Sequence, residues 1–159
     1  MSHLCCSRVI FFSKKQDTHT ILCSESKKIV FSRPPQHTIL FYAHPQDVYL
    51  DLEKKKLVDE LIQGFPGIET ITQKINQFKS SGGSCLIFDD SLSMIENEIS
   101  TLFSAVSHHQ NCDIFFISQN LFYDHKEYRT MGLNCHYLFL MKNPSNIRQV
   151  NFSFYKKID

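Results

Sequence analysis

Two carboxylates stand together directly after an apolar run in the middle of the chain. The run, Cys85-Leu-Ile-Phe88, is typical of a strand buried on both faces, and Asp89 and Asp90 follow it. In nucleotide hydrolysis the first of two such acids helps to hold Mg²⁺, and the second polarises the attacking water. The same pair can also cap the helix that follows, which is a common role of aspartate. The pattern alone leaves both interpretations open.

A polar amide follows the next apolar run. Asp113–Ser118 predicts another buried strand, and Gln119-Asn120 lies at its carboxyl end. The roughly 30 residues between the acids and the amide suit one helix between two neighbouring parallel strands. An amide donates and accepts hydrogen bonds without changing charge, which suits a residue that senses a phosphate or orients the attacking water. Taken alone, Gln119 would be interpreted as a turn residue. Because Asp89-Asp90 lies at the expected distance along the chain, the acid pair and the amide support each other as parts of one site.

One arginine follows the amide. Arg129 has a guanidinium fork that matches phosphate oxygens bidentately, so it is a candidate finger that reaches the phosphate of a neighbouring subunit. The alternative is a surface residue that pairs with Asp124 or Glu127. The local sequence favours the surface role.

The composition gives no sign of attraction to nucleic acid or membrane. The 159 residues carry 17 Lys and Arg against 16 Asp and Glu, so a net charge of +1 creates no global field for DNA. The apolar runs are far shorter than the ~20 residues that cross a bilayer, and no signal peptide is evident. Six cysteines without a C-x-x-C pair predict no disulfide framework. We expect an intracellular protein, cytoplasmic or nuclear.

Short apolar runs alternate with amphipathic stretches over most of the chain. Strands are predicted at Thr38–Ala43, Cys85–Phe88, Asp113–Ser118 and Tyr137–Met141, and helices at Asp47–Gln63, Ile68–Phe78, Ile95–Val106 and Tyr128–Leu133. This alternation favours an α/β fold of three layers with a mostly parallel central sheet. In such sheets the ligand lies beyond the carboxyl ends of the strands, where the acids and the amide are expected.

Several segments resemble one known family in consecutive order. They are Ser107-His-His-Gln-Asn111, Ile114-Phe-Phe-Ile-Ser-Gln-Asn-Leu-Phe122, Tyr128-Arg-Thr-Met-Gly-Leu-Asn134, His136-Tyr137-Leu138 and Lys142-Asn-Pro144. The family is the DNA-packaging ATPases of Maverick/Polinton transposable elements and related large DNA viruses, within the HerA/FtsK-like P-loop superfamily. Upstream, Cys85–Asp90 resembles the family's Walker B strand. The similarity covers residues 31–150.

The resemblance implies one P-loop NTPase-like domain over residues 1–159, with a recognisable core at 31–150. It implies an ATP-driven motor that assembles as a ring and moves double-stranded DNA into a capsid, with ATP and Mg²⁺ as cofactors. By the motif match, Asp89 is the Mg²⁺ ligand, Asp90 the water-activating acid and Gln119 the sensor, while Arg129 is a weaker match for the finger.

The chain departs from the family at the phosphate-binding loop. The motif G-x-x-x-x-G-K-[ST] should follow the first strand, for which Val9–Phe12 is the candidate, and precede a helix that begins near Thr20. The segment between them, Ser13-Lys-Lys-Gln-Asp-Thr18, has no glycine, so its backbone N–H groups cannot form the usual nest for phosphates. No nucleotide-binding motif is intact. Gly82-Gly83 precedes the strand of Asp89 and is not that loop.

The sequence therefore favours an impaired derivative of such an ATPase over a working one. A fragment of a longer protein that carries the missing loop is a further interpretation. The alternatives outside the enzyme class are a non-enzymatic α/β interaction protein and a nonfunctional transposon remnant.

Overall fold

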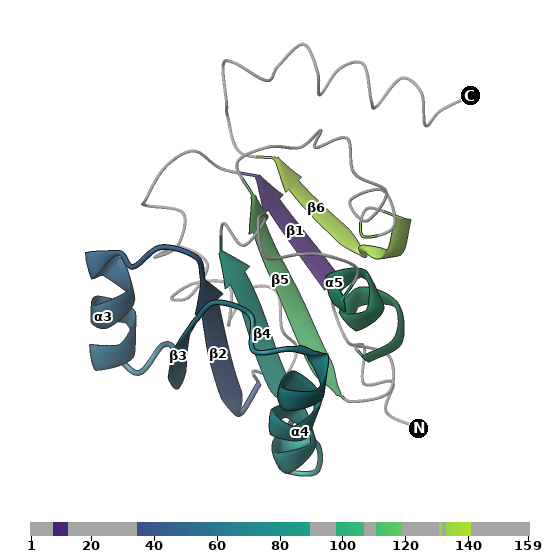
Figure 1. Cartoon of the computed structure of the whole chain (residues 1–159), viewed down its shortest axis with the longest axis horizontal. Coiled ribbons are helices and arrows are strands. Elements are labelled where there is room, and N and C mark those ends of the chain that lie inside the picture. The colour runs from purple at the N-terminus through teal and green to yellow at the C-terminus, as the bar shows by residue number, and fades with distance from the viewer. Residues whose placement is uncertain are drawn as a thin grey trace.

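A single parallel sheet organises the chain in the computed structural model (Figure 1). The structure describes residues 8–12, 35–89, 98–106, 111–118, 131 and 133–140. Among these residues six strands lie in the order β3-β2-β4-β5-β1-β6, and every neighbouring pair is parallel. The strands are β1 (Arg8–Phe12), β2 (His37–Tyr42), β3 (Glu60–Gln63), β4 (Ser84–Asp89), β5 (Cys112–Ser118) and β6 (Tyr137–Leu140).

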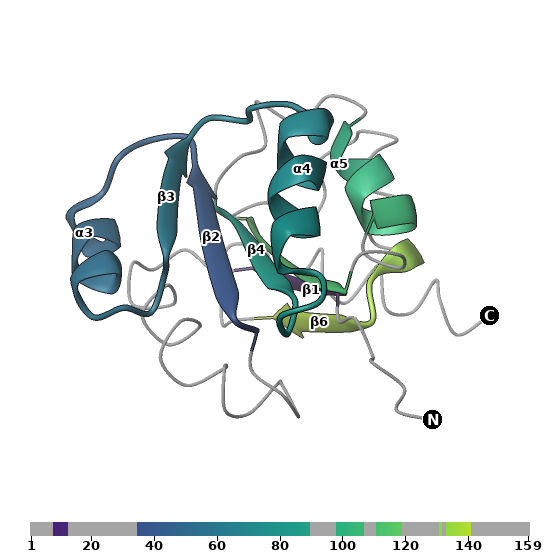
Figure 2. The same ribbon diagram turned by 90° about the horizontal axis from the view of Figure 1, so that it is seen from below.

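Helices cover both faces of this sheet. Helix α4 (Ile68–Phe78) and helix α5 (Glu98–Thr101), which continues as a π-helix over Leu102–Val106, pack on one face. Helix α3 (Asp47–Lys54) packs on the other. Figure 2 shows α4 and α5 on the same side of the strands. The expected fold class is confirmed: this is a three-layer α/β fold with a parallel central sheet.

Alternation along the central strands divides the core into two clusters, as the pleat of a strand requires. On the face of α4 and α5 the buried strand residues are Ile39, Phe41, Leu86, Phe88, Cys112, Ile114 and Phe116. On the face of α3 they are Leu40, Cys85, Ile87, Phe115 and Ile117. Strands buried on both faces explain why the sequence runs here are continuously apolar rather than alternating.

Helix α4 has the limits that its periodicity predicts. Ile71 and Ile75 are fully buried against the sheet, one turn apart. The helix begins after Gly67, whose φ of +90° favours glycine. Within the first turn, the Thr72 hydroxyl donates a hydrogen bond to the Ile68 carbonyl at 2.7 Å.

The predicted helix over Asp47–Gln63 is wrong beyond Lys54, and its last four residues are strand β3. The helix ends because Lys56 takes a left-handed φ of +54°. The N–H of Leu57 then donates to the Leu52 carbonyl at 3.0 Å, and that of Lys56 donates to the Glu53 carbonyl at 2.9 Å, the pattern of a Schellman motif. Glycine is usual at the left-handed position, so lysine there gave no stop signal.

The other predicted elements agree with the structure where it describes them. Strand β1 occurs at the segment proposed for the first strand, and it pairs with both β5 and β6. The helix expected over Ile95–Val106 is described from Glu98, and the one expected over Tyr128–Leu133 is helical at Met131 and Leu133. No helix in the described ranges is long and apolar enough to cross a membrane.

Candidate functional site

Three neighbouring strands end together at the carboxyl edge of the sheet. Strand β4 ends at Asp89, β5 at Ser118 and β1 at Phe12. In the register, Asp89 pairs with Ile117 and Phe12 pairs with Ser118, so the three ends are level to within one residue. The expectation that the acids and the amide follow adjacent parallel strands is therefore confirmed at the level of the strands.

Most of the predicted site residues lie beyond the strand ends and outside the described residues. These are Asp90, Gln119 and Arg129, together with the glycine-free segment Ser13–Thr18. Asp90, Gln119 and Ser13 directly follow the last residues of β4, β5 and β1. The roles predicted for them stay predictions. Asp89 is the member of the set whose surroundings the structure describes.

Asp89 is a buried carboxylate on the α3 face of the sheet. Its side chain is 2% exposed. It lies two and four residues beyond Ile87 and Cys85, which belong to the core cluster on that face. Its register partners are Tyr42 on β2 and Ile117 on β5. An aromatic and an aliphatic residue therefore flank the carboxylate within the sheet.

The Tyr49 hydroxyl donates a hydrogen bond to Asp89 Oδ2. Tyr49 lies in the first turn of α3 and is itself 2% exposed. Its ring centroid is 4.9 Å from that of Tyr42, with a tilt of 36° between the ring planes. A hydrogen bond to an ionised acceptor is stronger than a neutral one, and a buried carboxylate needs such a partner. Core packing therefore holds this donor in place.

Sequence reasoning missed Tyr49. The predicted helix over Asp47–Gln63 singled out no residue of its first turn, whereas the structure buries Tyr49 and leaves Val48 only partly buried. The available signal was the spacing of Tyr49 three residues before Leu52, which places both on one helix face. No sequence pattern indicated that the hydroxyl would meet a carboxylate of β4.

Asp89 has the chemistry of a Mg²⁺ ligand, since nucleotide-bound Mg²⁺ is held by one or two carboxylates together with phosphates and water. The described surroundings fit a hydrogen-bonded carboxylate better. The side chain is enclosed, one of its oxygens accepts from Tyr49, and within the described residues no three His, Cys, Asp or Glu side chains form a group that could hold a metal. The metal role of Asp89 stays a prediction.

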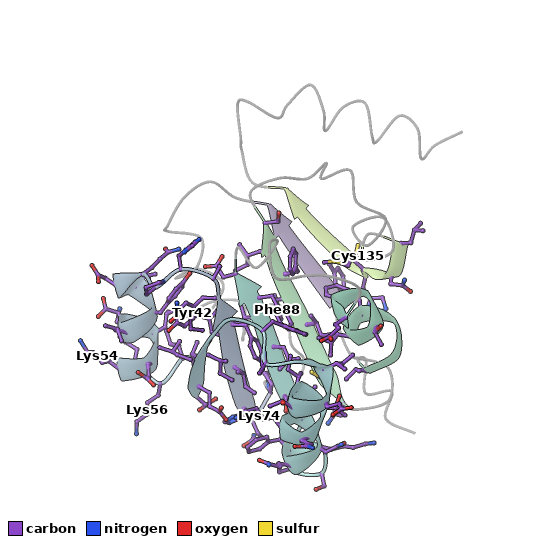
Figure 3. All side chains as sticks on the ribbon, viewed as in Figure 1. Tyr42, Lys54, Lys56, Lys74, Phe88 and Cys135 are labelled. Carbon is purple, nitrogen blue, oxygen red and sulfur yellow. The ribbon has the colours of Figure 1, made fainter. Side chains whose placement is uncertain are left out.

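A second polar cluster lies at the opposite, amino edge of the sheet. His37 Nε2 lies 2.9 Å from Glu60 Oε1, and Lys74 Nζ lies 2.5 Å from Glu60 Oε2. The His37 ring stacks on Phe78 with centroids 3.9 Å apart, and Asp59 Oδ2 accepts from the Thr38 N–H at 2.7 Å. Figure 3 shows Lys74 near the starts of the strands and Tyr42 toward their arrowheads.

Charge in this second cluster is locally compensated. Partial burial by itself raises the pKa of Glu60, but the hydrogen bonds from Lys74 and His37 outweigh it and hold that pKa below its ordinary value. The three side chains come from β2, β3 and α4, so the cluster ties one helix to two strands. Its members are 14–32% exposed, which indicates a structural role at the protein surface.

Comparisons with known proteins leave the family of this chain unassigned. No model of a protein family matches the chain, and no curated protein sequence matches it. The crystal structure of the Pyrococcus furiosus Hef helicase domain is similar to 91% of this chain at 12% sequence identity, with a TM-score of 0.36. The chain spans 31% of that structure's length. At this distance the similarity identifies no function, which must be argued from the site.

Proposed function

We propose that this chain is a derivative of a P-loop packaging ATPase in which the nucleotide site no longer works. It keeps the sheet and the buried acid of the site but does not bind Mg-ATP tightly. Its role is then that of a non-hydrolysing α/β domain, which assembles with copies of itself or with intact relatives. The observation that carries the proposal is the state of Asp89, buried and hydrogen-bonded to Tyr49 at the carboxyl edge.

The strand arrangement supports the ancestry. A nucleotide site of this kind needs a phosphate-binding loop, a metal-binding acid and a sensor on one sheet edge. Here β1, β5 and β4 are consecutive in the sheet, and the segments that would supply the loop, the sensor and the acid follow or end these strands. An acid that stood at a strand end by chance would not need β4, β5 and β1 to be neighbours in the sheet.

The chemistry of the segment after β1 supports the impairment. Side chains at every position of Ser13-Lys-Lys-Gln-Asp-Thr18 keep the backbone away from phosphate oxygens, and Asp17 repels them. Mg²⁺, where it is bound in such sites, neutralises charge on the β- and γ-phosphates. A carboxylate already engaged by a core tyrosine is poorly placed for that task.

The partners of the ancestral motor belong to the same proposal. Ring assembly and contact with double-stranded DNA are retained only if the surfaces for them survived the loss of ATP binding. The near-neutral net charge of +1 supplies no general attraction to DNA. We therefore expect any DNA contact to depend on assembly.

Thermal unfolding with and without Mg-ATP tests the proposal. A ligand at 100 times its dissociation constant stabilises the native state by about 2.7 kcal/mol, which corresponds to a rise in Tm of roughly 5–10 °C for a chain of this size. At about 5 mM Mg-ATP, a dissociation constant of about 50 µM would therefore be obvious. We expect no measurable rise for the wild-type chain.

The Asp89→Asn variant is the matched control. It keeps an acceptor for the Tyr49 hydroxyl and removes the charge that a metal would need. A rise in Tm of the wild-type chain with Mg-ATP that Asp89→Asn abolishes would contradict impairment and indicate a working site. A broad, non-cooperative transition of the wild-type chain would favour the poorly folded remnant instead.

A further inference from the structure

The outer side of helix α3 carries a large apolar side chain. Tyr49 and Leu52 bury the inner side of the helix in the core, whereas Leu50 between them is 53% exposed. Among the described residues, the other large apolar side chains that are exposed are Leu133 and Tyr137. A single exposed leucine is common on protein surfaces, so the residues around Leu50 decide whether it has a role.

Charged residues of opposite sign flank Leu50 along the helix. Asp47 lies three residues before it and Lys54 four residues after it, a spacing that places all three on one side of the helix. All three are exposed, and we call them the outer stripe of α3. The helix dipole accounts for an acid in the first turn and a base in the last turn, but not for the exposed leucine between them.

The outer stripe is complementary to a second copy of itself when the two copies run antiparallel. A two-fold axis through the middle of the stripe brings Asp47 of each copy close to Lys54 of the other, and it places the two Leu50 side chains together at the centre. A parallel arrangement would instead bring like charges together. Because a two-fold contact uses the same surface on both copies, this order of charges suits such a contact.

We propose that two copies of this chain associate through α3, with their outer stripes antiparallel across a two-fold axis. This inference rests on the proposed function, in which the chain assembles without hydrolysing ATP, and it names the surface used. The contact is closed, because it occupies the same surface on both copies. It therefore ends at a dimer, whereas head-to-tail contacts would build a ring or a filament.

The position of α3 leaves its outer side accessible. In Figures 1 and 2, α3 lies at the end of the sheet that carries β3, apart from α4 and α5. Figure 3 shows Lys54 and Lys56 pointing away from the strands. Lys54 Nζ lies 4.0 Å from Asp51 Oδ1, and the two side chains are 76% and 63% exposed. An ion pair this exposed contributes little to stability, so Lys54 can turn to a second copy at small cost.

The size of the contact sets its strength. Helix α3 has 8 residues, which corresponds to a length of about 12 Å. A contact centred on so short a helix buries less than the roughly 1,200 Å² of a standard interface, so the dimer is weak and transient. We expect a dissociation constant on the order of 100 µM, with a clear dependence on salt because the flanking charges are exposed.

Sedimentation velocity of the whole chain over about 10–500 µM tests the proposal. The wild-type chain should form a dimer at about 50 mM salt and a weaker one at about 500 mM. Leu50→Glu should raise the dissociation constant at least about tenfold, because it places two like charges at the centre of the contact. Glu69→Lys, which reverses an exposed acid in the first turn of α4, is the matched control and should leave that constant unchanged.

A charge swap between two variants separates this contact from a structural role of the same residues. Asp47→Lys and Lys54→Asp should each weaken self-association at least about tenfold, because each brings like charges together. Mixed in equal amounts, the two variants should form a mixed dimer within about threefold of the wild-type dissociation constant, since opposite charges then meet again. The same swap on α4, Glu69→Lys mixed with Lys79→Glu, should give the wild-type value.

The inference fails if the wild-type chain stays monomeric over this range, if Leu50→Glu associates as tightly as the wild-type chain, or if the charge-swapped mixture stays monomeric. The substituted side chains are exposed, so each variant should keep its Tm within about 2 °C of the wild-type value. Should Leu50→Glu not fold, the charge swap decides.

Mg-ATP keeps the inference and the proposed function distinguishable. A monomeric wild-type chain that Mg-ATP does not stabilise would remove the α3 contact and leave the proposed loss of nucleotide binding in place. A dimer whose variants behave as expected, in a chain that Mg-ATP does stabilise, would remove the proposed loss and leave the α3 contact in place.

Discussion

The acidic side chains at the two edges of the sheet differ in burial and in their hydrogen-bond partners. At the amino edge, Glu60 meets two basic partners, His37 and Lys74, and all three remain partly exposed. At the carboxyl edge, Asp89 is buried, and the donor described for it is a neutral hydroxyl. Partly exposed ion pairs contribute little to stability, whereas a buried carboxylate is tolerated only where its partner is well placed.

The two acids differ in the free-energy cost of keeping them in the folded chain. An acid at the amino edge needs no function to explain it, because pairing across strands and solvent compensate its charge. A buried acid at the carboxyl edge lies where parallel α/β sheets bind ligands. The proposed function explains the position of Asp89 as that of a former nucleotide-site acid, and the structure gives it a hydrogen bond from Tyr49.

The largest expected effect contrasts two glycines with the same backbone conformation. Gly83, at the amino edge, has φ of +86°, and an added Cβ would lie 2.5 Å from the Asn111 carbonyl oxygen. Gly64, at the carboxyl edge, has φ of +85° with nothing within 4 Å of an added Cβ. Gly83→Ala should cost about 3 kcal/mol or more, and Gly64→Ala about 1–2 kcal/mol.

Urea unfolding of the two glycine variants measures this contrast. Both variants put alanine at a positive φ, so this conformational cost is common to the two. The difference between their free energies of unfolding therefore reports the close contact between Gly83 and Asn111. Equal destabilisation by Gly83→Ala and Gly64→Ala would mean that the contact with Asn111 adds nothing to the cost of the Gly83 variant.

The next effect contrasts the two carboxylates. Asp89→Ala leaves the buried Tyr49 hydroxyl without its described acceptor and should lower the free energy of unfolding by about 2 kcal/mol. Glu60→Ala removes a partly exposed partner of Lys74 and should cost less than about 1 kcal/mol. Denaturant titration near neutral pH measures both. A larger loss of unfolding free energy for Glu60→Ala than for Asp89→Ala would contradict the greater importance assigned to the buried acid.

The smallest effect is a pH dependence at the amino edge. The pKa of Glu60 is lowered in the folded chain, so its contribution is present above the unfolded value and is lost as pH falls through the folded value. The loss therefore occurs in the acid range, below the ordinary glutamate pKa of 4.5. Glu60→Gln should remove this part of the acid destabilisation, seen as a shallower pH dependence than in the wild-type chain. An unchanged acid slope would contradict the pairing.

Much of the fold was predictable because its central strands are continuously apolar and α4 is strongly periodic. The pattern identified β2, β4 and β5, and it predicted helix α4, whose Ile71 and Ile75 are buried in the core. It failed after Lys54. Leu57, Val58, Leu61 and Ile62 keep a spacing that a helix also allows, and lysine occupies the turn position where glycine would have marked the end.

The candidate site was predictable only in part. The position of Asp89 followed from the strand and the rule that ligands lie at carboxyl ends. The contact with Tyr49 joins residues 40 positions apart, and it depends on how α3 returns over the sheet. The spacing of residues along the chain does not predict such a contact. The residues of β3, which follows α3, also fitted a helical spacing, so the path of the chain after α3 was not predicted either.

Paramagnetic broadening by Mn²⁺-ATP is the most direct test of the central claim, that Asp89 lies where a nucleotide's metal would be but is not available to it. Backbone amide signals of the uniformly labelled chain would be recorded with millimolar Mn²⁺-ATP. We predict no selective broadening at Asp89 or at its register partners Tyr42 and Ile117. Selective loss of these signals in the wild-type chain, absent from Asp89→Asn, would contradict the account.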